Sequence, residues 1–153
     1  MPFRSHWPLR RTRRGVELHL SQDELDFLRA LAESHREQLG SDHPDLRRLF
    51  PTAYLEDPER DMEYQILARS ELLDHRHAAL DMFIGSLSSD SLTDDEVAAW
   101  MQSINQFRLV LGTRLDMGED EEEIDETAPD AAERALYGYL GVILGHLVEA
   151  TPL

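Results

Sequence analysis

Apolar residues recur every three or four positions along most of the chain, a spacing that is typical of amphipathic helices. This spacing predicts four main helices and one short helix, over residues 22–39, 43–49, 58–87 and 94–115, with a last helix that begins at Pro129. Three helices open with start signals, namely the capping boxes Ser21–Glu24 and Thr93–Glu96 and the pair Asp57-Pro58. No internal repeat is present, so we expect one bundle rather than a repeat array.

Each predicted helix has one apolar face that should be buried. In the first helix this face carries Leu25, Leu28, Leu31, Ala32, His35 and Leu39. In the second it carries Met62, Ile66, Leu73, Leu80, Ile84 and Leu87. In the third it carries Val97, Trp100, Met101, Ile104, Phe107, Leu111 and Leu115, and in the last Leu136, Leu140, Ile143 and Leu147. Gly138, Gly141 and Gly145 share one side of the last helix, which predicts close approach of a neighbouring helix there.

Apolar and polar residues alternate from Val16 to Leu20, which predicts a short strand or extended segment. The expected fold is therefore all-α, a bundle of four main helices plus a short helix, with this short N-terminal extended strand. We expect a basic flexible arm at residues 1–14 and a single helical domain at 15–153. Within that domain, residues 116–128 are expected to form an acidic loop, because eight of the eleven residues at 116–126 are acids.

The composition excludes several kinds of chemistry. The 153 residues contain no Cys, and all 15 basic residues are Arg, so thiol catalysis, thiolate metal sites, disulfides and lysine-based catalysis are ruled out. The formal net charge of −16 disfavours direct binding to nucleic-acid phosphates. No apolar run is long enough to cross a membrane, and the basic start leads into no apolar signal segment, so we expect a cytoplasmic protein.

Motifs for metal or catalytic chemistry are missing as well. Two pairs, Glu71/His75 and His77/Asp81, have helical spacing but fall on opposite faces of their helix, so they cannot form one site. The sequence contains no HExxH, P-loop, GxGxxG or GxSxG motif. We therefore expect no catalytic residues, no metal and no cofactor, and a protein that is not an enzyme.

Three arginines stand among apolar helix positions. Arg108 lies within the apolar face of the third helix, and Arg69 and Arg76 flank that of the second. A buried guanidinium is costly unless it is paired and fully hydrogen-bonded. Two interpretations remain open: these side chains snorkel or pair with carboxylates, or they offer a site for a partner's acidic group or a small anion.

The first fourteen residues carry five arginines and no acid. Arg10, Arg11, Arg13 and Arg14 form this candidate basic arm, with Phe3 and Trp7 beside it. The arm could touch nucleic-acid phosphates weakly, contact an acidic partner protein, or be a disordered tail. The acidic run could be a solvated loop, a mimic of a phosphate backbone that enters a basic channel on a partner such as RNA polymerase, or a cover for the arm.

Some stretches of the chain resemble a known family. They are residues 47–54 (RRLFPTAY) with Asp57-Pro58-Glu59, residues 105–115 (NQFRLVLGTRL) preceded by Trp100, and Arg13-Arg14-Gly15. They are similar to an actinobacterial domain-of-unknown-function family whose members are described as AosR-like oxidative-stress regulators and are often encoded beside the ClpS proteolysis adaptor. The resemblance covers roughly residues 10–150. It adds Asn105 and Arg114 to the candidate interaction or anion-binding residues Arg69, Arg76 and Arg108.

The resemblance implies a non-enzymatic transcription regulator that works by contact with a sigma factor or RNA polymerase. The alternatives are an adaptor or accessory factor in Clp-type proteolysis and a small-anion-binding protein. Thiol-based redox sensing belongs to the family's regulatory role, and this chain departs from it because it has no Cys. A homodimer through the glycine side of the last helix is a further expectation.

Overall fold

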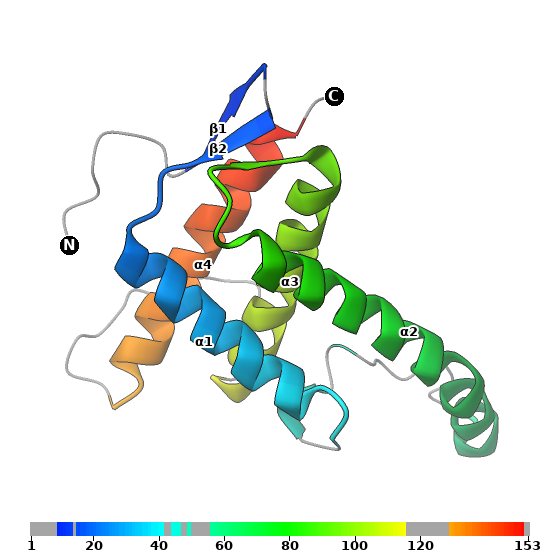
Figure 1. The fold of residues 1–153 in the computed structure, drawn as a ribbon. Coiled ribbons are helices and arrows are strands. Elements are labelled where there is room, and N and C mark those ends of the chain that lie inside the picture. Colours follow the sequence, from blue (N-terminus) through cyan, green and yellow to red (C-terminus); the bar gives the residue numbers. More distant parts are fainter. Residues whose placement is uncertain are drawn as a thin grey trace.

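The computed structural model describes residues 9–13, 15–41, 44–46, 49, 56–115 and 129–151, with only the backbone at positions 65 and 67. The elements follow the chain as β1 (Leu9–Thr12), β2 (Gly15–Leu18), α1 (Gln22–Gln38), the 3-10 helix η1 (Pro44–Leu46), α2 (Pro58–Ser86), β3 (Ser91–Leu92), α3 (Asp94–Arg114) and α4 (Ala131–Ala150). Helix α3 lies at the centre, where it packs against α1, α2 and α4 (Figure 1). None of the described helices is both long and apolar enough to span a membrane.

The three strands form a small antiparallel sheet in the order β1-β2-β3. This corrects the expected all-α fold: the chain is mostly helical, and the predicted short strand is present as β2, which ends at Leu18 and pairs with two further strands. Strand β1 escaped prediction because its sequence, Leu-Arg-Arg-Thr, shows little apolar alternation, and β3 has only two residues. Gly15 makes the hairpin possible: its φ is 119°, and a Cβ there would lie 2.3 Å from the carbonyl oxygen of Leu92.

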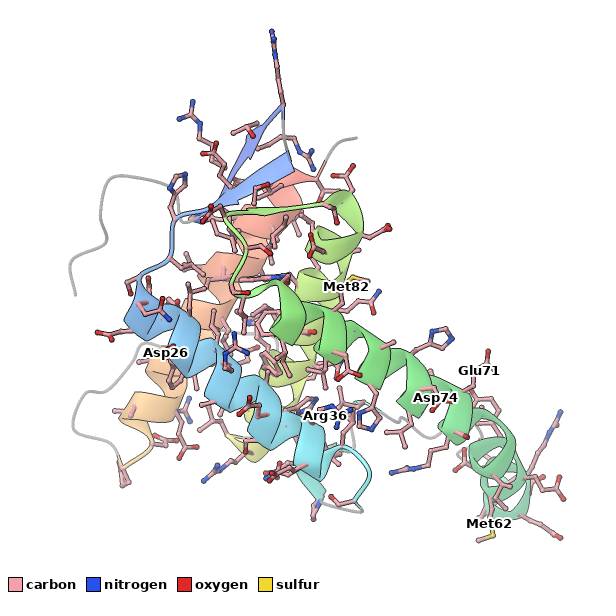
Figure 2. All side chains as sticks on the ribbon, viewed as in Figure 1. Asp26, Arg36, Met62, Glu71, Asp74 and Met82 are labelled. Carbon is pink, nitrogen blue, oxygen red and sulfur yellow. The ribbon has the colours of Figure 1, made fainter. Side chains whose placement is uncertain are left out.

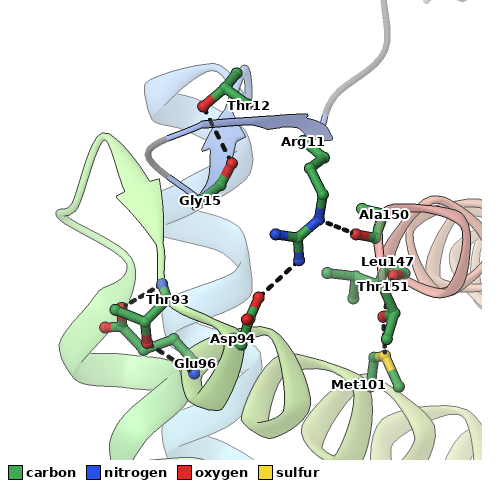
Figure 3. A network of polar contacts seen from close by, with 10 residues as sticks. All are labelled: Arg11, Thr12, Gly15, Thr93, Asp94, Glu96, Met101, Leu147, Ala150 and Thr151. Carbon is green, nitrogen blue, oxygen red and sulfur yellow. Dashed lines mark hydrogen bonds and ion pairs between the residues drawn. The ribbon is translucent and has the colours of Figure 1, made fainter. Parts of the chain in front are cut away.

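The second half of the expected flexible arm is part of this sheet. Leu9 is buried and pairs with Leu18 across the hairpin. From β1, Arg11 reaches both α3 and α4 (Figure 3). The sheet therefore holds residues 9–12 against the helices, while residues 1–8 and Arg14 lie outside the described residues.

Three of the predicted helix starts are confirmed, whereas the last helix begins at Ala131 rather than at Pro129. Ser21 and Thr93 each accept a hydrogen bond from the backbone amide three residues later, and the glutamate at that position bonds back to the cap amide. Asp57 caps α2 by accepting from the backbone amide of Arg60, with Pro58 as the first helical residue. The predicted short helix is the 3-10 helix η1, and the expected acidic loop at 116–128 falls outside the described residues.

The core forms where the sheet, α2, α3 and α4 meet. Trp100 is fully buried, and its ring contacts that of Phe83 edge to face, with centroids 4.6 Å apart. The indole Nε1 of Trp100 donates a 2.7 Å hydrogen bond to Oγ of Ser86, which in turn donates to the carbonyl of Phe83. Core positions predicted from the helix pattern, including Leu28, Leu80, Val97, Ile104, Leu140, Ile143 and Leu147, are buried.

Two predictions about helix faces are wrong. Met62 and Ile66 were expected in the core, but they are 65% and 72% exposed, because the first turns of α2 extend beyond the bundle. Gly138 and Gly145 were expected to admit a neighbouring helix, but a Cβ at either would meet nothing within 4 Å. Gly141 alone of the three is closely approached, by the guanidinium of Arg108 rather than by another backbone.

Candidate functional site

The N-terminal end of α2 projects from the rest of the described structure (Figure 1). Figure 2 shows Met62 at the far end of this helix, with Glu71 and Asp74 along its length and Met82 next to the bundle. Leu72 and Leu73 are the first residues of α2, among those whose side chains the structure describes, that pack against the core. We call residues 56–66, which precede that contact, the α2 tip.

A single apolar face runs along α2 from the tip into the core. At 100° per residue, positions 62, 66, 73 and 80 lie within about 40° of one another around the helix. Leu80 is fully buried and Leu73 partly buried against the core, whereas Met62 and Ile66 are exposed. The same face is thus covered by the protein's own core at one end and left to solvent at the other.

The α2 tip is also strongly acidic. It carries five acids and one base, namely Glu56, Asp57, Glu59, Asp61 and Glu63 against Arg60. Glu56, Asp57, Glu59 and Glu63 are exposed, so their charge reaches solvent. Tyr64 is also an exposed large side chain here. The α2 tip thus presents two exposed apolar side chains on an acidic surface.

The arginines proposed from the sequence on α2 are both engaged within the protein. Arg76 donates from Nη2 to the carbonyl of Leu49 at 3.0 Å, and burial lowers the pKa of its guanidinium. Arg69 is half-buried and also makes an interaction. These contacts fit the interpretation in which both arginines support the packing of α2.

The candidate residues on α3 face α4 or solvent. The guanidinium of Arg108 lies over the ring of Tyr137, 4.2 Å from its centroid, and packs against Gly141. Arg114 forms an ion pair with Glu133, with Nε 3.3 Å from Oε2, and Asn105 is exposed. Two of the five candidates thus lie on α2 and three on α3, and each described contact of these residues is with a different partner.

The candidate arm is likewise divided. Arg11 forms an ion pair with Asp94 and donates to the carbonyl of Ala150, so its charge is paired at the surface by groups of α3 and α4. Arg10 and Arg13 are exposed at the hairpin, and Arg14 lies outside the described residues. Among the described residues, Arg10 and Arg13 are thus the exposed arginines of the proposed arm that have no described ion pair.

A buried polar pair, His35 and Gln106, lies between α1 and α3, and the sequence pattern assigns it no function. His35 donates from Nε2 to Oε1 of Gln106 at 2.9 Å, and its ring contacts Phe107 edge to face. Burial lowers the pKa of His35, although the hydrogen bond with Gln106 acts in the opposite direction. From the sequence, His35 belongs to the apolar face of the first helix. That position could have predicted that its imidazole is buried and neutral.

His35 also borders a pocket of about 470 Å³ between α1, η1, α3 and α4. Its wall is apolar at Leu31, Phe107, Val110, Leu111, Leu136 and Leu140, and polar at Ser34, His35, Gln38, Asp45 and Arg114. Arg114 is thus the one sequence-proposed residue at this pocket. The rim carries one cation and one anion, which favours neither sign of ligand.

The described residues contain no group of three His, Asp or Glu side chains that could hold a metal ion. Of the two helical pairs noted in the sequence, Glu71 and His75 are exposed and 3.9 Å apart. Asp81 accepts instead from Nε of Arg36 at 2.8 Å, and this hydrogen bond lowers the pKa of the Asp81 carboxyl.

Residues 4–151 match the family described as Domain of unknown function (DUF2017). Curated relatives named oxidative stress regulator AosR, from Mycobacterium bovis and Mycobacterium tuberculosis, are 26% identical to the chain over 144 residues. The match covers 82% of this chain and 65% of each relative, so the chain spans just under two thirds of the length of these proteins. No solved structure matches the chain.

Proposed function

The chain belongs to the DUF2017 family, and from this premise we propose that it is a non-enzymatic regulatory protein of the cytoplasm that acts by contact with the transcription machinery, such as a sigma factor or RNA polymerase. The observation that carries the proposal is the similarity to relatives named oxidative stress regulator, which extends over 82% of the chain. Those relatives are longer than this chain, and their printed name states no partner.

The surface of the molecule supports contact with a protein as the mode of action. The α2 tip exposes Met62 and Ile66 on a helix that projects from the bundle, where a partner could reach them (Figure 2). The net charge of −16 opposes direct binding to nucleic acid, except weakly through exposed arginines such as Arg10 and Arg13. A regulator of this kind would reach DNA through a partner.

The signal that the protein answers cannot be a disulfide, because the chain has no Cys. The side chains of Met62 and Met82 are exposed, so their sulfur atoms are accessible to soluble oxidants. Met62 lies on the proposed contact surface, and a sulfoxide there would replace an apolar contact with a polar one. Regulation by oxidation of Met62 would therefore act through the contact surface.

The proposal is tested by affinity capture from lysate of the native organism, read by mass spectrometry. RNA polymerase or a sigma factor should be enriched by the full chain. A second bait that lacks residues 1–8 keeps β1 and the contacts of Arg11, so any loss of binding would report on the removed arginine and aromatics rather than on unfolding. Enrichment of Clp components instead would support the adaptor alternative, and enrichment of neither would contradict both proposals.

A further inference from the structure

We propose that the α2 tip inserts Met62 and Ile66 into an apolar groove of a partner protein whose rim carries arginine or lysine. The inference rests on the proposed function only in that the protein acts by contact, and it adds the surface and the chemistry of the partner. Three features of the tip support it: the exposure of these two side chains, their place on the helix, and the charges around them.

The apolar pair lies where a helix-in-groove contact needs it. Met62 and Ile66 are one helical turn apart, so their side chains stand next to each other on one face. Single exposed apolar residues are ordinary on protein surfaces. Met62 and Ile66 differ because they lie on the same face of α2 as Leu73 and Leu80, which pack in the core. The apolar face of α2 therefore continues beyond the core as an exposed surface.

The length of the projecting helix supports the same conclusion. Pro58 to Glu71 make up fourteen residues of α2 ahead of Leu72, the first apolar side chain described on this helix that packs against the core, and within them Arg69 is half-buried and makes an interaction. In proteins most of the stability of a helix comes from packing of its apolar face, and at this end of α2 Met62 and Ile66 are exposed. Packing of the apolar face in a groove would stabilise this segment, as in other complexes in which residues at i and i+4 of a helix act as anchors.

The charges decide what kind of partner fits. Five acids surround the apolar pair within residues 56–66, with Arg60 as the single base. A groove edged by arginine or lysine would be attracted to this surface, and an acidic groove would be repelled. A second copy of this chain would bring the same acidic surface against itself, so the face is poorly suited to a symmetric dimer.

The test places a photo-cross-linking amino acid, p-benzoylphenylalanine, at position 66 of the full chain. The control carries it at position 27, because Phe27 is also exposed, at 46%, but lies on α1. After irradiation in native lysate, the cross-linked peptides are identified by mass spectrometry. We expect position 66 to capture segments in which apolar residues stand beside arginine or lysine, at least tenfold more than position 27 does. This capture should fall when the salt is raised to about 0.5 M.

The other results either overturn the inference or separate it from the proposed function. Absence of capture above the control, or capture of acidic segments, would mean that the tip is not the contact surface. Cross-links to a second copy of the chain, with a dimer in analytical ultracentrifugation, would assign the face to self-association. Basic segments from proteins outside transcription would uphold the inference and contradict the proposed function. Capture of RNA polymerase by the bait without cross-links at position 66 would uphold the proposed function and contradict the inference about the α2 tip.

Discussion

The guanidinium of Arg11 lies 2.7 Å from the carboxylate of Asp94, measured from Nη2 to Oδ1, and so joins the first strand to the start of α3. The same side chain donates from Nε to the carbonyl of Ala150 at the end of α4 (Figure 3). Asp94 lies in the first turn of α3, where the helix dipole favours a negative side chain. The carbonyl of Ala150 lies in the last turn of α4, where the dipole favours a positive group such as Arg11. One arginine thus connects three elements that are distant in the sequence.

Replacement of Arg11 by alanine should lower the stability of the fold. Both groups of the ion pair are partly exposed to solvent, so we expect a loss of about 1 kcal/mol, or about 2–4 °C in Tm for a chain of this size. Arg10→Ala on the same exposed strand is the matched control and should leave the Tm within about 1 °C. Equal melting temperatures for the two variants would show that the Arg11 contacts do not stabilise the fold.

Gly15 should tolerate no side chain. Its φ of 119° and the 2.3 Å approach of the Leu92 carbonyl predict a loss of at least about 2 kcal/mol in Gly15→Ala. Gly40→Ala is the control, since a Cβ there meets nothing within 4 Å, and it should be neutral or slightly stabilising. Urea unfolding of both variants measures the difference, and a Gly15→Ala protein as stable as the parent would mean that the hairpin is not held as described.

Two buried serines should respond in opposite ways to alanine. Ser86→Ala removes the acceptor of the Trp100 indole N–H and leaves a buried donor unpaired, which should cost about 1–3 kcal/mol. The hydroxyl of Ser103 is buried with no hydrogen-bond partner among the described residues, so Ser103→Ala should be neutral or mildly stabilising. Thermal melts decide, and a destabilised Ser103→Ala protein would reveal a contact that the structure does not show.

The buried His35 should make the stability depend on pH. Burial lowers its pKa in the folded state, while in the unfolded chain it takes up a proton near pH 6.5. As the pH falls below about 6.5, the unfolded state therefore binds more protons, and stability falls until the folded pKa is reached, by at most about 1.4 kcal/mol per pH unit. Above pH 6.5 the effect of His35 vanishes.

The comparison of the parent with His35→Gln isolates this effect. Glutamine cannot titrate, so the variant should lose less stability than the parent between about pH 7 and pH 5.5 in urea unfolding. The other histidines are common to both proteins and cancel in the difference. Parallel stability curves for the two proteins would show that His35 titrates in the folded state as it does in the unfolded chain.

The local signals in the sequence were good guides to the helices. The Ser21 and Thr93 caps and the Asp57-Pro58 start all occur, because a cap depends on residues within one turn. Burial was a poorer guide on α2. The face that includes Met62 and Ile66 has the right period for a core, but periodicity cannot tell how far a neighbouring element extends to cover it.

The sheet and the candidate site depended on distant contacts that no local pattern reveals. Arg11 read as part of a flexible basic arm because its partners, Asp94 and Ala150, stand 83 and 139 residues away. The glycines of α4 suggested a close helix neighbour, yet Gly138 and Gly145 face open space. Arg108 stands within an apolar helix face, and its guanidinium lies over the ring of Tyr137, a partner that the pattern of its own helix could not reveal.

The most direct test of the account is binding of the purified chain to purified RNA polymerase holoenzyme of the same organism, measured for the parent, Ile66→Gln and Phe27→Gln. Ile66 is 72% exposed, so glutamine there should leave the melting temperature unchanged. We predict that the parent and Phe27→Gln bind with equal Kd, and that Ile66→Gln binds at least about tenfold more weakly. No binding by the parent, or equal binding by all three proteins, would contradict the account.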